Sequence, residues 1–393
     1  MDALSELLRL GESDKAARGL LHTPAEISQQ PDTWLSTFDL FDRKRSEIAQ
    51  FLSTSGFGSD SKPIVFLIGA GTSDYIGQSV AYLLRSLWHC EVNAVPSTDL
   101  LTHLEPLLIP GRKYLWISFS RSGDSPEGVA VLEQAYRNHP DIHHLVISCN
   151  AGGRMIRESV GKPHVLSVCL DDAVNDRGLA MTSSFSNMVV FGQCLAHIQH
   201  LDGYEHILRQ LVHAGRTFLP LAADRAAALA KEPYAKACFV GSGPLRAVAK
   251  ECALKLLEMT SGKVLTMSES ALGLRHGPMA ALDDNTLFVC SLSGNPRVQN
   301  YERDLLQEIG KKRLVRTRIV VGGGGDNGKD HCAEHYLTAA AAASIPDDYR
   351  PALDVIFGQL LGLFFSLRCN LKPDCPSPSG AISRVVQGVN IHF

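Results

Sequence analysis

The chain has 393 residues, of which 45% are hydrophobic and 20% are charged. This length and composition predict two or three globular domains with substantial buried cores. The net charge of −3 and the shortness of the basic run 311–313 argue against nucleic acid as a partner. The longest apolar stretch, Val355 to Leu367, is too short to cross a bilayer, and the N-terminus lacks a signal-peptide pattern. We therefore expect a cytoplasmic protein with no membrane partner.

Ten cysteines are scattered along the chain without a CxxC pair. Several end apolar runs, which is typical of reduced, buried thiols. The only spacing that resembles a metal site is His331, Cys332 and His335. No second ligand cluster stands beside it, so a polar turn is the favoured interpretation and no metal is expected.

The chain begins with a segment expected to be helical. Thr23 can cap a helix, Pro24 suits its first position, and Glu26 can reach back as in a capping box. Apolar residues then recur near helical spacing from Asp32 to Leu52. The glycine- and serine-rich residues 53–61 are predicted to link this helical segment to a first domain.

A fully apolar run, Ile64 to Ile68, predicts a strand buried on both faces of a parallel sheet. It leads directly into GAGTS, where two glycines allow a tight turn and a helix begins near Thr72 and Ser73. The N-terminus of that helix offers free N–H groups to an anion. A dinucleotide site is disfavoured because Asp74 stands where GxGxxG requires its third glycine.

The next strand and helix repeat this arrangement with more hydroxyl groups. Residues 114–118 predict a strand, FSRSGDS a loop, and residues 126–137 a helix. A serine-rich helix cap would explain one such loop. Two consecutive hydroxyl-rich turns favour a phosphate site at the carboxyl ends of a parallel sheet. The candidate side chains in this second loop are Ser120, Arg121, Ser122 and Ser125.

Further elements suggest an internal duplication. Strands are predicted at 143–149 and 165–169, followed by an apolar helix that starts in TSSFS and an alanine-rich helical stretch. The same order then returns, with strands at 237–240, 287–291 and 319–321 and a glycine turn after the first of them. The expected segments are a helical segment 1–52, a first domain 53–202, a connecting helix 203–231, a second domain 232–370 and a tail 371–393.

The chemically distinctive stretch runs from Glu251 to Pro278. Glu251, Lys255 and Glu258 stand at i, i+4 and i+7 and share one stripe of a predicted helix. The following GLRHGP cannot be regular helix, so it should present the imidazole of His276 from a turn. Spacing alone favours a solvated salt-bridge stripe and a surface-turn histidine over a catalytic pair.

Together these motifs resemble the SIS (sugar isomerase) domain family, in tandem as in the isomerase half of glucosamine-6-phosphate synthase. GAGTS and SFSRSGDS are similar to the family's phosphate loops, and ECALKLLE with LRHGP to its catalytic helix and histidine loop. HTPAEISQQPDTW and PSPSGAISRVVQGV resemble the AgaS type, the galactosamine-6-phosphate deaminase/isomerases. The resemblance implies an α/β fold of two tandem SIS domains, each a parallel sheet flanked by helices in a three-layer, flavodoxin-like arrangement.

The resemblance also implies roles for individual residues. Glu258 would be the proton-shuttling base, His276 would open the sugar ring, and Lys255 would orient them as a cation. The phosphate would be held by Ser73, Ser120, Arg121, Ser122 and Ser125, with Thr72 near the sugar. Arg384 stands where the synthase tail offers a lysine, so no Schiff base is expected there, because guanidinium does not lose its proton.

The implied reaction converts a hexosamine 6-phosphate, galactosamine 6-phosphate by this resemblance, to tagatose 6-phosphate and ammonia. It requires no metal or organic cofactor. Related SIS enzymes lend the histidine loop across a subunit boundary, so a homodimer is expected. The alternatives are action on a glucosamine phosphate, an aldose-ketose isomerase that releases no ammonia, and a sugar-phosphate sensor without catalysis. A sensor would need neither Glu258 nor His276, and residues 1–52 lack a basic recognition helix.

Overall fold

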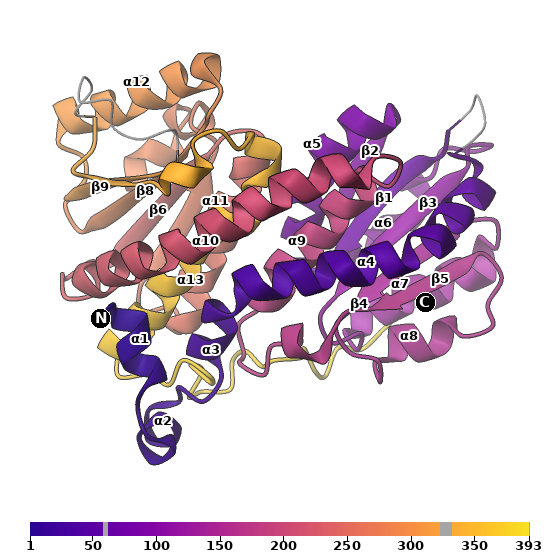
Figure 1. The fold of residues 1–393 in the computed structure, drawn as a ribbon, viewed down its shortest axis with the longest axis horizontal. Helices are drawn as coiled ribbons and strands as arrows, with labels where there is room; N and C mark the ends of the chain where they lie inside the picture. The colour runs from indigo at the N-terminus through magenta and orange to yellow at the C-terminus, as the bar shows by residue number, and fades with distance from the viewer. Residues whose placement is uncertain (58–61, 323–331, 393) are drawn as a thin grey trace. The chain divides into compact units, whose positions relative to one another are not determined.

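The computed structural model describes residues 1–57, 62–322 and 332–392. Its described residues form two compact units, each built on one parallel five-stranded sheet (Figure 1). We call them the N-sheet unit and the C-sheet unit. The N-sheet unit comprises residues 33–176, 183–205 and 383–393, and the C-sheet unit comprises residues 1–32, 177–182 and 206–382.

The N-terminal segment is mostly helical, as predicted for residues 1–52, but the expected capping box is wrong. His22, not Thr23, precedes helix α3, and the Thr23 hydroxyl donates to Asp374 at 2.8 Å. The Glu26 carboxylate accepts from the backbone N–H of Gly178 instead of reaching back to the helix start. Both side chains therefore bind distant segments of the C-sheet unit. The helical elements are α1 (Ala3–Leu8), α2 (Glu12–Arg18), α3 (Thr23–Ser28), α4 (Gln30–Leu52) and a π-helical turn (Ser53–Phe57).

The predicted linker 53–61 is only partly described. Its first five residues continue helix α4 as the π-helical turn, and residues 58–61 lie outside the described part of the chain.

The N-sheet unit has the strand order β2-β1-β3-β4-β5, all parallel. Strands β1 and β3 are buried at every position, as the unbroken apolar run Ile64 to Ile68 predicts for β1. Strand β2 was not predicted, because it is a half-buried edge strand with a short polar interruption. The strands are β1 (Ile64–Gly69), β2 (Val92–Pro96), β3 (Tyr114–Ser120), β4 (His143–Ser148) and β5 (Val165–Cys169).

Helices cover both faces of this sheet. Alternate β1 residues Ile64, Phe66 and Ile68 join an apolar cluster with side chains of α6 and α7. Leu67 points to the other face, toward α5. Helix α4 packs on α9 through a T-shaped contact of Phe41 with Phe191. The helices are α5 (Thr72–Trp88), α6 (Ser97–Leu107), α7 (Pro126–Asn138), α8 (Arg154–Ser159) and α9 (Ser183–Ala196).

The C-sheet unit has the strand order β10-β9-β8-β6-β7, again all parallel. Strands β7 and β10 were not predicted, because both are short edge strands that lack a continuous apolar run. The strands are β6 (Lys236–Gly241), β7 (Leu265–Glu269), β8 (Thr286–Leu292), β9 (Thr317–Gly322) and β10 (His335–Leu337).

Helix α12 covers one face of the C-sheet and packs on it through Leu305, Leu306 and Ile309 (Figure 1). Helices α11 and α13 pack closely on one another. The helices after α9 are α10 (Leu201–Leu229), α11 (Pro244–Met259), α12 (Pro296–Lys312) and α13 (Pro351–Arg368).

The predicted duplication is visible in both topology and backbone. In each sheet the first strand lies between the second and the third, so the order 2-1-3-4-5 is repeated as 7-6-8-9-10. The loops after the first strands share an unusual conformation, since Gly71 has φ 55° and ψ −123° and Gly243 has φ 56° and ψ −129°. Both glycines immediately precede a helix. The fold is thus the predicted tandem of α/β domains.

Helices α11 and α13 approach closely because α13 presents glycines. A Cβ atom on Gly358 would lie 2.3 Å from the Cys252 Sγ atom, and one on Gly362 would lie 2.6 Å from Met259 Sδ. By length and composition α13 alone among the described helices could cross a membrane, but 89% of it is buried inside the protein. Its apolar surface is therefore explained by the core of the C-sheet unit.

Gly358→Ala is predicted to destabilise the protein by about 1–3 kcal/mol, because the added methyl group overpacks the α11–α13 contact. Thermal or urea unfolding measures the change. Gly203→Ala is the matched control, since Gly203 also lies in a helix but nothing is within 4 Å of its added Cβ. The control should be neutral or stabilise by up to about 1 kcal/mol. Equal losses in the two variants would contradict the packing argument.

Candidate active site

The predicted phosphate loops follow strands β1 and β3, which are neighbours in the N-sheet. After β1 the chain continues to β2, on one side of β1, and after β3 it continues to β4, on the opposite side. The loop after β1 and the loop after β3 therefore diverge at the carboxyl ends of these strands. This is the position at which open parallel sheets bind ligands. Thr72 and Ser73 form the first turn of α5, and each is less than 10% exposed. The topology thus brings the two predicted loops to one edge of the sheet.

The second loop is held rigidly by its own hydrogen bonds. Ser120 Oγ accepts from the Gly123 N–H at 3.0 Å, and Ser122 Oγ accepts from the Asp124 N–H at 3.1 Å. A hydroxyl that accepts in this way can still donate its own proton. The Asn150 amide, which the sequence analysis did not single out, holds the Ser122 carbonyl at 2.8 Å. The loop is therefore preorganised with hydroxyl donors.

Ser125 differs from the other serines of this loop. It stands at the N-cap of α7, and its Oγ accepts from the Gly128 N–H at 3.3 Å. This is the helix-cap geometry that the sequence also allowed.

Arg121 is 6% exposed, and its guanidinium donates to the backbone carbonyl of Arg384. Arg384 in turn donates to the Asn175 Oδ1 atom at 2.7 Å and to the Asp176 carbonyl at 2.8 Å. The tail residues 383–392 are thereby attached to the N-sheet unit beside Arg121. Nothing in the pattern SGAISRVV indicated this partner, because the contact joins residues 263 positions apart.

The charged stripe of α11 is buried, unlike a solvated salt-bridge stripe. The Lys255 side chain is 1% exposed and lies 3.3 Å from Glu251 Oε1 and 2.7 Å from Glu258 Oε2. Glu251 is fully buried, whereas the Glu258 side chain is 24% exposed. Two carboxylates thus share one buried ammonium, and only Glu258 reaches solvent. Burying charged groups costs desolvation free energy, and clusters of this kind are typical of active sites.

His276 lies in the C-sheet unit between two 3₁₀ turns, Gly273–Arg275 and Pro278–Ala281, as the bracketing glycine and proline predicted. Its side chain is exposed. Among the described residues, none is recorded as a hydrogen-bond partner of its ring. The ring is therefore accessible to a ligand or to another protein chain.

Within residues 1–57, 62–322 and 332–392, no group of three His, Cys, Asp or Glu side chains is placed to hold a metal ion. His331, from the weak metal-like spacing, lies outside the described residues. Cys332 is buried, and its backbone N–H donates to the Tyr336 hydroxyl at 3.0 Å.

Comparison with known proteins identifies the family. Residues 59–198 match the SIS domain family. An AgaS protein of Streptomyces coelicolor is 37% identical over 377 residues, which are 95% of each chain. This chain belongs to the AgaS family. The D-galactosamine-6-phosphate deaminase AgaS of Escherichia coli is 33% identical over 378 residues, 94% of this chain and 95% of the relative.

A solved structure supports the same grouping. Tagatose-6-phosphate ketose/aldose isomerase from Escherichia coli superposes with a TM-score of 0.84 at 30% identity, and the match covers 94% of this chain and 96% of that chain. The predicted tandem SIS fold and the AgaS resemblance are confirmed.

Ser122→Ala is predicted to weaken the binding of a hexosamine 6-phosphate by roughly 10- to 100-fold, since a hydrogen bond to a charged group contributes about 1.5–3 kcal/mol. Combining it with Arg121→Ala should weaken binding further. Titration calorimetry measures the dissociation constant. Ser125→Ala is the contrast variant, because loss of its cap should mainly lower stability, by about 1 kcal/mol. Unchanged affinity in Ser122→Ala would remove this loop from the phosphate site.

Proposed function

We propose that this protein is an amino-sugar phosphate deaminase/isomerase that converts galactosamine 6-phosphate and water to tagatose 6-phosphate and ammonia. The observation that carries the proposal is the buried ammonium of Lys255 between two carboxylates, in a chain of the AgaS family. Such a group supplies a carboxylate base held in place beside a fixed cation. Ser73, Ser120, Arg121 and Ser122 would hold the phosphate, with Thr72 near the sugar and Ser125 supporting the loop.

The first step opens the sugar ring. His276 moves the proton of the C1 hydroxyl to the ring oxygen as the C1–O5 bond breaks, which leaves an aldehyde at C1. An imidazole suits this transfer because it gains and loses a proton near neutral pH.

The second step moves a proton from C2 to C1. The Glu258 carboxylate removes the C2 proton as the C1 oxygen takes up a proton, and an enolamine forms. Glu258 then returns its proton to C1 as the amino group gives up one of its own, which leaves a hydroxyl at C1 and an imine at C2. When Glu258 is protonated, the Lys255 ammonium still has a charged partner, because it stays paired with Glu251 at 3.3 Å. Without Glu251, the same step would leave a buried ammonium uncompensated, which is costly. Glu251 is therefore a positioning residue for this reaction.

The last step is hydrolysis. Water adds to the C2 imine, and ammonia leaves as the ketone forms. The product is a ketose 6-phosphate.

The decisive experiment is to incubate the protein with galactosamine 6-phosphate, glucosamine 6-phosphate and the neutral hexose 6-phosphates and to assay ammonia and ketose together. Stoichiometric ammonia and tagatose 6-phosphate from the galacto substrate support the proposal. Ketose from neutral aldose phosphates without ammonia would favour a simple isomerase, the activity named for the Escherichia coli structure. Binding without turnover of any substrate would indicate a sensor.

Glu258→Gln is predicted to lower turnover by about 10²- to 10⁴-fold while substrate still binds, because the amide keeps the shape of the side chain but loses its basicity. Exchange of the C2 proton with solvent deuterium reports this step by itself. The glutamine variant should show no exchange even with substrate already in open-chain form. His276→Ala should retain exchange with such substrate. Persistent exchange in Glu258→Gln would dismiss Glu258 as the base.

The protein is also proposed to be a cytoplasmic homodimer in which the His276 loop serves the partner's active site. The exposed ring of His276 supports this arrangement, since a catalytic imidazole needs an oriented partner.

Mixing inactive Glu258→Gln and His276→Ala proteins under conditions of subunit exchange is therefore predicted to restore part of the activity. A mixed dimer would contain one active site with both wild-type residues. Activity is measured against each variant alone, and exchange is followed with a labelled subunit. Complete exchange without recovery would place Glu258 and His276 of one site in the same chain.

A further inference from the structure

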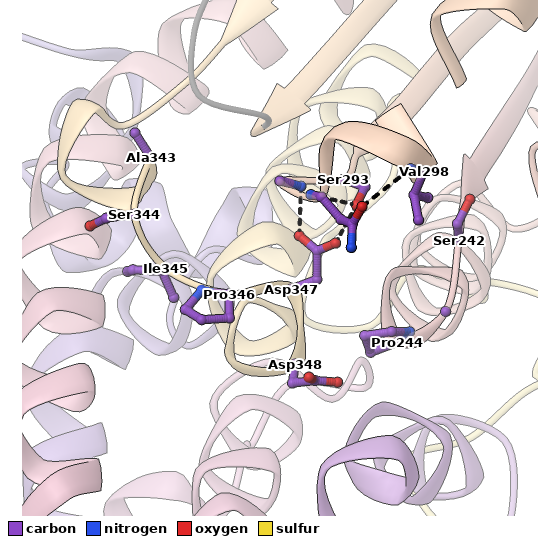
Figure 2. Close-up of a pocket in the computed structure, with 13 residues that line it drawn as sticks. Ser242, Pro244, Ser293, Val298, Ala343, Ser344, Ile345, Pro346, Asp347 and Asp348 are labelled. Atoms are coloured by element: carbon purple, nitrogen blue, oxygen red, sulfur yellow. Dashed lines mark hydrogen bonds between the residues drawn. The ribbon is translucent and has the colours of Figure 1, made fainter. Parts of the chain in front are cut away.

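The C-sheet has its own crevice where the loops after β6 and β8 diverge, at the position that the phosphate loops occupy in the N-sheet. A cavity of about 410 Å³ lies there (Figure 2). Its walls come from the β6 loop, the β8 loop and residues 343–348. The proposed function assigns no role to this cavity.

The β8 loop repeats the geometry of the β3 loop. Ser293 Oγ accepts from the Asn295 N–H at 3.0 Å, as Ser122 Oγ accepts from the Asp124 N–H at 3.1 Å. In both loops a glycine follows the serine, and a proline soon opens a long helix. Ser293 is therefore the counterpart of Ser122.

An anion already occupies this second loop. The Ser293 hydroxyl donates to one oxygen of Asp347, and the Gly294 N–H donates to the other at 2.8 Å (Figure 2). Asp347 is more than 50 residues distant in the chain and belongs to a separate 3₁₀ turn, Asp347–Tyr349. Its carboxylate receives hydroxyl and amide donors of the same kinds that the N-sheet loop offers.

A buried cation completes the arrangement. The Arg350 side chain is 2% exposed, and its Nη1 atom donates to Asp347 Oδ1 at 2.8 Å and to the Leu292 carbonyl at 2.9 Å. Its other nitrogens face Asp354, which is also buried. A hydroxyl, a backbone N–H and a buried guanidinium thus converge on the Asp347 carboxylate.

We propose that the second domain retains an anion site that the chain fills with the carboxylate of Asp347, and that removal of this carboxylate opens the site to inorganic phosphate. The comparison with the β3 loop rests on the proposed function, whereas the contacts of Asp347 do not. In the wild-type protein the site stays closed, because Asp347 and Asp348 repel a second anion. Burial and the neighbouring Asp347 carboxylate raise the pKa of Asp348, which reflects this negative potential.

The test compares the wild type with Asp347→Ala in equilibrium dialysis against radiolabelled inorganic phosphate at constant ionic strength. The variant should bind one more phosphate per chain than the wild type. Its melting temperature should be lower without phosphate and should rise with phosphate, saturably and by about 2–4 °C more than that of the wild type. Asp347→Asn, which removes the charge but keeps the size of the side chain and one acceptor oxygen, provides a second variant if the alanine variant does not fold.

Two controls isolate the site. Asp354→Asn removes the other carboxylate partner of Arg350 without opening the cavity, since Asp354 does not line it. Asp348→Asn removes a cavity carboxylate but leaves Asp347 in place. Neither control should gain a phosphate.

Folded Asp347 variants that bind no additional phosphate would overturn the inference, as would an equal gain in Asp348→Asn. This outcome can be told apart from failure of the proposed function. The difference in bound phosphate between variant and wild type does not depend on whether the N-sheet loops bind phosphate. If the wild type binds no phosphate and the Asp347 variant binds one, the N-sheet phosphate site is rejected and the second anion site is supported.

Discussion

The strand order of the two sheets is the constraint on which the candidate sites depend. Because the first strand of each sheet lies between the second and the third, the chain must leave the first and third strands in opposite directions. The loops after those strands cannot pack on one another, and the crevice between them faces the N-termini of the helices that follow. The glycine turns at Gly71 and Gly243 meet this constraint with nearly the same left-handed backbone.

The two crevices offer an anion different surroundings. In the N-sheet the first helix starts with Thr72 and Ser73, whose hydroxyls add donors. In the C-sheet Pro244 and Leu245 stand at the start of α11 and offer no hydroxyl. There the anion comes from within the chain, as Asp347, and Arg350 neutralises it. A duplicated fold can thus keep the geometry of the loop while, in its second copy, a carboxylate of the same chain binds there.

Helix α11 shows how burial changes the meaning of a charge pattern. On an exposed helix, carboxylate and ammonium groups at this spacing contribute little to stability and need no functional explanation. Close packing against α13, which Gly358 and Gly362 permit, places Lys255 out of solvent. Its ammonium is then paired with both Glu251 and Glu258, and of these two carboxylates only Glu258 is partly exposed.

The sequence by itself determined the α/β class, the duplication and the two hydroxyl-rich loops, because buried parallel strands are continuous apolar runs and glycine turns are local features. It also placed Glu258 and His276 on a helix and a turn. The tertiary structure decided what depends on distant residues. Thr23 and Glu26 bind Asp374 and Gly178 rather than forming a capping box, because partners far along the chain satisfy their polar groups. The edge strands β2, β7 and β10, the burial of Lys255, the attachment of Arg384 beside Arg121 and the place of Asp347 could not be predicted, since each follows from contacts between segments that local patterns do not join.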